Sequence, residues 1–331
     1  MTVRAPEQIA VLGAGSWGTA VALALAHQGH DVLLWARDPL HVQNMQASRS
    51  NEKYLPAIPF PQNLAVTSSL KDTQNYPNIL ISVPSHAFLG LLQQLPKLPK
   101  QGIAWLTKGI EPDSHRLFSD IIVERFGPTP MAIISGPSFA KEVAAQKPTA
   151  LIVASQEKAW ALHWQKLLHS NVTRVYISDD LPGVQLCGAI KNVLAIACGI
   201  SDGLEFGANS RAALMTRGIA EMLHLGLAMG GKSETFYGLA GLGDLVLTCT
   251  DNQSRNRRFG ILIGKNYSQE QACHEIKQVV EGLHNATQVA ALARKYHVDM
   301  PITNAVEQII KGQLTPKEAA YQLLSRPLPN E

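Results

Sequence analysis

Cysteine is scarce in this chain of 331 residues: there are four, and no two of them form a CxxC pair. Without closely spaced cysteines, the chain lacks the disulfide framework that supports many small secreted domains. We therefore expect reduced thiols in the core of a cytoplasmic protein, namely Cys187, Cys198, Cys249 and Cys273.

Metal-ligand spacings and a strong charge of one sign are also missing. The 11 histidines are dispersed, with no HExxH pattern and no Cys/His array, so we expect no metal. The formal net charge is only +3, and the basic residues are scattered except for one cluster near residue 255. Nucleic acid is therefore not the expected partner.

Residues 8–26 carry no charge, as in a signal peptide or a membrane-spanning segment, but they do not form an uninterrupted apolar run. Gly13, Gly15 and Gly18 interrupt the stretch, and no region rich in Lys or Arg precedes it. An apolar strand, a turn and a helix account for a stretch of this length, so we expect no membrane insertion.

What the chain does have is a glycine-rich turn between two apolar segments. Residues 9–12 predict a buried strand and residues 19–26 a helix, with the GxGxxG spacing of Gly13, Gly15 and Gly18 between them. These glycines allow a sharp turn, close approach of the backbone to a pyrophosphate, and tight packing of helix on strand. The pattern predicts a dinucleotide site, since a second strand at residues 31–35 completes a βαβ unit.

Further apolar runs alternate with helical stretches over the first half of the chain. The expected strands share near-continuous hydrophobicity and lie at residues 78–84, 102–109, 131–138, 149–153 and 172–177. Such strands indicate a mainly parallel, doubly wound sheet of the Rossmann type, covered on both faces. A helix is expected at 39–48, followed by a proline-rich stretch, 54–61, that we interpret as a long loop because it suits neither a helix nor a central strand.

Ligands bind beyond the carboxyl ends of the strands in sheets of this kind. Arg37 follows the second strand, where a site selective for NAD(H) usually has an acidic residue, and an arginine there can pair with the 2′-phosphate of NADP(H). We expect NADP(H), with NAD(H) left open and a solvated arginine as the alternative. Lys108 closes another strand and is expected to project toward the nicotinamide end, the alternative being a surface lysine in a loop.

After residue 183 the pattern becomes helical, so we expect a Rossmann domain at 1–183 and an all-helical substrate-binding and catalytic domain at 184–331. The expected helices of the second domain lie at residues 184–200, 210–229, 254–264, 283–296, 302–311 and 316–324. Lys191 is the one charged residue of the first of them. Burial would lower its pKa and make it a general acid/base, whereas the alternative is a lysine that extends to solvent at the domain junction.

Two further segments of the second domain carry candidate ligand-binding groups. Residues 238–248 contain several glycines that suit a loop folded against a ligand, and Asp244 can orient a neighbouring cation. The triplet 254–256 places a hydroxyl, a guanidinium and an amide at a helix start, which suits a phosphate monoester. Arg257 and Arg258 are interpreted as a solvated basic face.

Six motifs in register make the chain resemble the bacterial NAD(P)-dependent glycerol-3-phosphate dehydrogenases over nearly its whole length. They are GAGSWGTA at residues 13–20, TKG at 107–109, SGPSFA at 135–140, GAIKN at 188–192, GLGDL at 241–245 and SRN at 254–256. The resemblance implies reduction of dihydroxyacetone phosphate to sn-glycerol 3-phosphate, in supply of phospholipid synthesis. Families of this plan are commonly homodimers.

The resemblance also implies roles for individual residues. Lys191 would be the proton donor and acceptor, and Lys108 would touch both cofactor and substrate. The substrate pocket would further include Gly136, Ser138, Asn192, Asp244, Ser254, Arg255 and Asn256. Cofactor contacts would come from the glycine turn and from Ser16, Trp17, Arg37, Lys108, Ala140, Arg255, Val279 and Glu281, of which Ala140, Val279 and Glu281 rest on the resemblance alone.

In the mechanism expected from these residues, Lys108 and Asn192 hold and polarise the substrate carbonyl while Arg255 and Asn256 hold the phosphate. A hydroxyacid or ketopantoate-type dehydrogenase of the same two-domain plan is the alternative within this fold. It would need a carboxylate receptor, and the same arginine could serve it. A non-catalytic dinucleotide sensor is the second alternative, although it would not need Lys108 and Lys191.

Overall fold

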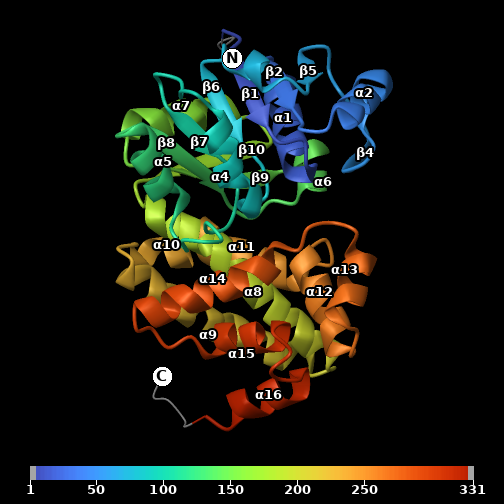
Figure 1. The fold of residues 1–331 in the computed structure, drawn as a ribbon, viewed down its shortest axis with the longest axis vertical. Helices are drawn as coiled ribbons and strands as arrows, with labels where there is room; N and C mark the ends of the chain where they lie inside the picture. Colours follow the sequence, from blue (N-terminus) through green and yellow to red (C-terminus); the bar gives the residue numbers. More distant parts are fainter. Residues whose placement is uncertain (1–4, 327–331) are drawn as a thin grey trace. The chain divides into compact units, whose positions relative to one another are not determined.

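The computed structural model describes residues 5–326, which form two compact units (Figure 1). The first comprises the described residues up to Lys108 together with Phe118–Leu181. The second comprises Gly109–Leu117 and the described residues from Pro182 onward. The short segment after Lys108 therefore groups with the second unit, which the hydrophobic pattern did not indicate.

The first unit is built on an eight-stranded sheet in the order β10-β9-β8-β7-β6-β1-β2-β5. Its strands are β1 (Gln8–Leu12), β2 (Asp31–Trp35), β5 (Leu64–Thr67), β6 (Asn78–Ile81), β7 (Ile103–Trp105), β8 (Met131–Ser135), β9 (Thr149–Ala154) and β10 (Thr173–Ser178). All neighbours are parallel except β8 and β9. The mainly parallel Rossmann-type sheet is confirmed, and β5, at an edge, is a strand that the sequence analysis did not find.

Helices pack against this sheet (Figure 1), and its central strands β1, β6, β7 and β8 are almost fully buried. They are α1 (Ser16–His27), α2 (Pro39–Ser48), α3 (Leu70–Thr73), α4 (Ser85–Gln94), α5 (Phe118–Phe126), α6 (Ala140–Ala144) and α7 (Lys158–Leu168). The proline-rich stretch expected to be a loop contains β4 (Leu55–Pro59), which pairs antiparallel with β3 (Ser50–Asn51) outside the main sheet. Prolines are compatible with such a two-stranded ribbon because an edge position does not need their missing N–H groups.

The described part of the second unit consists of helices, as expected from its periodicity. They are α8 (Leu181–Gly203), α9 (Gly207–Ala228), α10 (Ser233–Tyr237), the π-helical turn η1 (Leu239–Gly243), α11 (Asp244–Thr250), α12 (Arg255–Gly264), α13 (Gln269–Ile276), α14 (Glu281–Lys295), α15 (Pro301–Ile310) and α16 (Pro316–Leu324). Among the described residues α8 alone is long and apolar enough to cross a membrane, and its apolar window is fully buried within the structure. Burial on all sides is what a core helix shows.

The prediction of a loop at residues 238–248 is wrong, because that segment forms η1 followed by α11. A side chain at Gly241 would lie 2.1 Å from the carbonyl oxygen of Phe236. Glycine there permits close packing within a helical segment and does not indicate a free loop. The prediction that all four cysteines lie in the core is wrong for Cys273, which is only partly buried. The other three are buried free thiols.

Helices α8 and α12 pack unusually closely at two pairs of glycines. A Cβ atom at Gly199 would lie 2.1 Å from the Arg257 carbonyl oxygen, and one at Gly260 would lie 2.2 Å from that of Ile196. Gly203 and Gly264 repeat the arrangement one turn later. Since no larger residue fits, these glycines set the distance between the helix that carries Lys191 and the helix that begins at Arg255.

Candidate functional site

The glycine turn lies between β1 and α1, as expected, and its three glycines have different surroundings. Gly13 has φ +127°, and a Cβ there would lie 2.3 Å from the Ser82 carbonyl oxygen. A Cβ at Gly18 would lie 2.0 Å from the Gly13 carbonyl oxygen, whereas one at Gly15 would meet nothing within 4 Å. The outer two glycines are thus required by the packing of the protein on itself, and Gly15 leaves open space at the helix N-terminus.

This N-terminus fits the pyrophosphate of a dinucleotide. Gly15 is the N-cap of α1, no side chain caps the helix, and its first turn has no acidic residue. The free N–H groups and the positive end of the helix dipole therefore suit an anion. Trp17 places a buried indole Nε1 without a hydrogen-bond partner in the same turn, and the Ser16 hydroxyl donates to the Tyr54 carbonyl oxygen at 2.8 Å.

Two other residues expected to contact a cofactor lie in the first unit. Arg37 lies two residues after the end of β2 and is exposed, so its guanidinium is available to a 2′-phosphate. Ala140 is the first residue of α6 and is partly buried. Both roles stay predictions.

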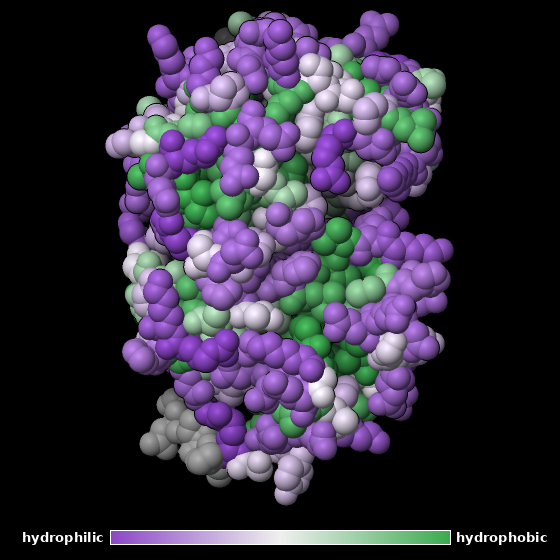
Figure 2. Space-filling model, in the orientation of Figure 1, coloured by the Kyte–Doolittle hydropathy of each residue, from purple (hydrophilic) through white to green (hydrophobic). Residues whose placement is uncertain are grey.

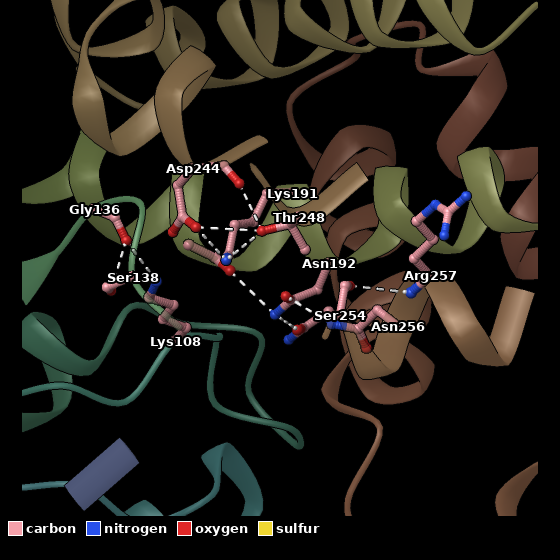
Figure 3. A network of polar contacts seen from close by, with 12 residues as sticks. Lys108, Gly136, Ser138, Lys191, Asn192, Asp244, Thr248, Ser254, Asn256 and Arg257 are labelled. Atoms are coloured by element: carbon pink, nitrogen blue, oxygen red, sulfur yellow. Dashed lines mark hydrogen bonds and ion pairs between the residues drawn. The ribbon is translucent and has the colours of Figure 1, made fainter. Parts of the chain in front are cut away.

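Lys108, Gly136 and Ser138 come together at the ends of β7 and β8 (Figure 3). The Lys108 Nζ donates to the Gly136 carbonyl oxygen at 3.3 Å, and the Ser138 hydroxyl donates to the same oxygen at 3.0 Å. Gly136 has φ +122°, a conformation that favours glycine. The lysine is only partly buried, and its hydrogen bond to the turn orients it.

In the second unit, Lys191 is buried and paired with a carboxylate (Figure 3). Its Nζ lies 2.6 Å from Asp244 Oδ1 and donates to the Thr248 hydroxyl oxygen at 2.9 Å. Thr248 in turn donates to the Asp244 main-chain oxygen at 2.6 Å. A carboxylate at this distance favours the ammonium form of the lysine, so the cluster holds a proton in place.

Asn192, the next residue on α8, lies in a chain of side-chain amides (Figure 3). Its Nδ2 donates to the Gly188 carbonyl oxygen at 3.2 Å and to Asn285 Oδ1 at 3.1 Å. Its Oδ1 accepts from Asn256 Nδ2 at 2.9 Å. Both amide hydrogens therefore have protein partners in this arrangement, and the side-chain oxygen is the group with spare capacity. The contact with the substrate carbonyl expected of Asn192 stays a prediction.

The triplet expected to receive a phosphate begins α12. Ser254 is its N-cap and accepts from the Arg257 main-chain N–H at 3.2 Å. Asn256 is buried, and Arg255 is partly buried, with burial lowering the pKa of its guanidinium and the nearby Glu281 opposing that shift. Glu281 begins α14, and Val279, also expected at the cofactor, is exposed just before it.

The solvated basic face expected of the next two residues is wrong at Arg257. Arg257 is buried, with its Nη2 2.5 Å from Asp202 Oδ2 and its Nη1 donating to Asn252 Oδ1. Arg258 is partly buried. Arg257 thus ties the start of α12 to the end of α8, and the phosphate-binding candidates remain Arg255 and Asn256.

Sequence reasoning missed the residues that support this cluster. Thr248 lies four residues after Asp244, a helical spacing that could have revealed it once the segment was identified as a helix. Asn285 and Gln288 lie on α14 and are buried polar residues with no motif to mark them. A cavity of about 560 Å³ in the same unit, walled by Ile200, Phe259, Ile309 and other mostly apolar residues, contains none of the expected site residues.

The family comparisons cover both units. The model described as the NAD-dependent glycerol-3-phosphate dehydrogenase N-terminus matches residues 8–161, and the model of the C-terminus matches residues 180–321. The chain belongs to this dehydrogenase family. It is 55% identical over 327 residues to glycerol-3-phosphate dehydrogenase [NAD(P)+] of Legionella pneumophila (strain Lens), covering 98% of this chain and 99% of that protein.

A solved structure supports the family assignment at the level of the fold. The crystal structure of glycerol-3-phosphate dehydrogenase from Coxiella burnetii has a TM-score of 0.93 and 49% identity, covering 97% of this chain and 99% of that one. A PanE/ApbA family ketopantoate reductase from Ralstonia eutropha has a TM-score of 0.60 at 17% identity. The second likeness shows a shared fold alone, so the ketopantoate alternative gains no support as an activity.

Proposed function

We propose that this protein reduces dihydroxyacetone phosphate to sn-glycerol 3-phosphate, reversibly, with NADPH or NADH. The observation that carries the proposal is the buried Lys191–Asp244–Thr248 cluster beside the amides of Asn192 and Asn256, in a chain of this family. The names of its relatives supply the substrate and the cofactors.

The residues of the glycine turn fit a dinucleotide, and the nicotinamide of a reduced dinucleotide held there would supply the hydride. Gly15 and the N-terminal N–H groups of α1 would receive the pyrophosphate, and Arg37 a 2′-phosphate. The contacts expected of Trp17, Lys108, Ala140, Val279 and Glu281 are part of the same proposal.

Lys191 acts as the general acid. Its Nζ gives a proton to the C2 oxygen as the carbonyl carbon becomes a secondary alcohol, and it regains a proton from solvent. Asp244 and Thr248 orient the ammonium group, and Arg255 with Asn256 holds the phosphate, so that binding energy remote from the reacting carbon aligns it. Gly136, Ser138 and Ser254 complete the proposed substrate-binding set. We also propose a cytoplasmic homodimer whose product serves phospholipid synthesis.

The test follows the absorbance of reduced nicotinamide with dihydroxyacetone phosphate, using unphosphorylated dihydroxyacetone as the control. Oxidation of NADPH or NADH only with the phosphorylated ketone is expected. Turnover of 2-keto acids instead would favour the hydroxyacid alternative, and cofactor binding without any turnover would favour the sensor.

Lys191→Ala tests the general acid, since loss of such a group lowers the rate by about 10²–10⁴-fold. NADPH binding should be nearly unchanged because its proposed contacts include no Lys191 atom. Lys311→Ala is the matched control: it removes a partly exposed lysine paired with Glu307 at 2.8 Å and should leave turnover intact. Normal turnover of the Lys191 variant would remove this residue from its role.

A further inference from the structure

The amide chain through Asn192 has a defined direction. At one end the Gly282 main-chain N–H donates to Asn256 Oδ1 at 2.9 Å, and a main-chain N–H can only donate. Asn256 must therefore present its Nδ2 to Asn192 Oδ1, and Asn192 must present its Nδ2 onward to Asn285 Oδ1. The chain ends where Asn285 Nδ2 donates to Gln288 Oε1 at 3.1 Å.

This direction decides what the two site amides can offer a ligand. Asn192 donates both of its amide hydrogens, one to Asn285 Oδ1 and the other to the Gly188 carbonyl oxygen. It presents an oxygen lone pair, which suits a substrate hydroxyl. Asn256 has one amide hydrogen without a partner within residues 5–326, which suits a phosphate oxygen.

We propose that Asn285 is a positioning residue that fixes the orientation of the Asn192 and Asn256 amides, a role that rests on the proposed function. Asn285 is fully buried, and Asn192, Asn256 and Gln288 are nearly so. A flipped Asn192 amide would place its oxygen against the Asn285 oxygen and its Nδ2 against that of Asn256, which is costly in a buried site. The Asn285 oxygen and the Gly282 N–H, at opposite sides of the two site amides, therefore favour the same orientation. Gly282 fits the same arrangement, since a Cβ there would lie 3.0 Å from Asn256 Oδ1.

The test compares Asn285→Leu, which keeps the size but removes the acceptor, with Asn285→Asp, which keeps it. An aspartate accepts from Asn192 in either protonation state, because it can donate to Gln288 when protonated and accept from a turned Gln288 amide when ionised. For Asn285→Leu we expect a KM for dihydroxyacetone phosphate raised about tenfold, the factor for one lost buried hydrogen bond of about 1.4 kcal/mol. The kcat should change far less, and Asn285→Asp should restore the KM.

Thr303→Val is the matched control, because it removes another fully buried hydrogen bond of this unit, the 2.9 Å bond from Thr303 to Glu221. It should lower the melting temperature without raising the KM. Gln288→Leu is the second variant should Asn285→Leu fail to fold, with a smaller rise in KM expected. Calorimetric binding of glycerol 3-phosphate is measured alongside.

The outcomes separate this inference from the proposed function. If the wild type turns over, three results overturn the inference alone. They are an unchanged KM in Asn285→Leu, an Asn285→Asp variant as impaired as Asn285→Leu, and a KM rise in Thr303→Val equal to that in Asn285→Leu. A wild type that binds glycerol 3-phosphate without turnover overturns the function, and the same comparison is then made with binding constants. A wild type that neither binds nor turns over overturns both.

Discussion

Gly199→Ala should destabilise the second unit, although alanine normally stabilises a helix. The new Cβ would lie 2.1 Å from the Arg257 carbonyl oxygen, about 1.3 Å short of the 3.4 Å at which ordinary contact begins. It would also lie 2.9 Å from Gly260 Cα. Both atoms belong to the backbone of α12, so the two helices have to separate.

Overpacking of this kind costs about 1–3 kcal/mol. Separation of α8 from α12 should also lengthen the 2.9 Å bond between Asn192 and Asn256, so the KM for dihydroxyacetone phosphate should rise. Gly90→Ala is the matched control: Gly90 lies within α4, is exposed, and a Cβ there meets nothing within 4 Å. It should stabilise the protein by about 0.5–1 kcal/mol.

The measurement is scanning calorimetry, which resolves the units if they melt separately, together with steady-state kinetics. A unit of this size shifts its melting temperature by about 2–4 °C per kcal/mol. A Gly199→Ala protein as stable as Gly90→Ala, with an unchanged KM, would refute the argument that the glycines set the helix distance.

Three further variants test separate features of the second unit. Glu221 is a buried carboxylate that accepts from Ile302 N, Thr303 N and the Thr303 hydroxyl, and burial raises its pKa from 4.5 to about 7. The folded protein therefore keeps a proton that the unfolded chain releases, so this group's contribution to stability falls by about 3 kcal/mol as pH rises from 4.5 to 7. Glu221→Gln should lack that component in the pH dependence of the unfolding free energy, and identical slopes for the two proteins would contradict it. Arg257→Leu removes the buried guanidinium that pairs with Asp202, while Arg211 still pairs with Asp202 at 2.7 Å. It should therefore destabilise by about 1.5–3 kcal/mol in denaturant titrations, an effect that a solvated arginine would not produce. Arg255→Ala should mainly raise the KM for dihydroxyacetone phosphate, and a normal KM would move the proposed phosphate site elsewhere.

Local signals were enough for the elements that follow a simple pattern. The apolar runs of β1, β2 and β6 and the periodicity of α12 and α16 predicted these elements to within a few residues. β5 was not predicted because it is an edge strand of only four residues, too short for its apolar residues to form a recognisable run. The glycine-rich segment at 238–248 was predicted to be a loop but forms η1 and α11, because glycine occurs both in loops and where helices pack tightly.

By itself, the sequence determined which residue types were available for chemistry: a glycine turn at a helix start, Lys108, Lys191, Asp244 and the 254–256 triplet. Each of these residues stands in a short motif, and the order of residues within a short motif constrains local structure whatever the rest of the fold is. Tertiary structure alone decided that Arg257 is buried against Asp202, that Thr248 meets Lys191, and that Asn285 and Gln288 complete an amide chain reaching Asn192. Those partners lie up to 93 residues apart in the sequence, and they meet only where the helices that carry them pack against one another, which no local pattern encodes.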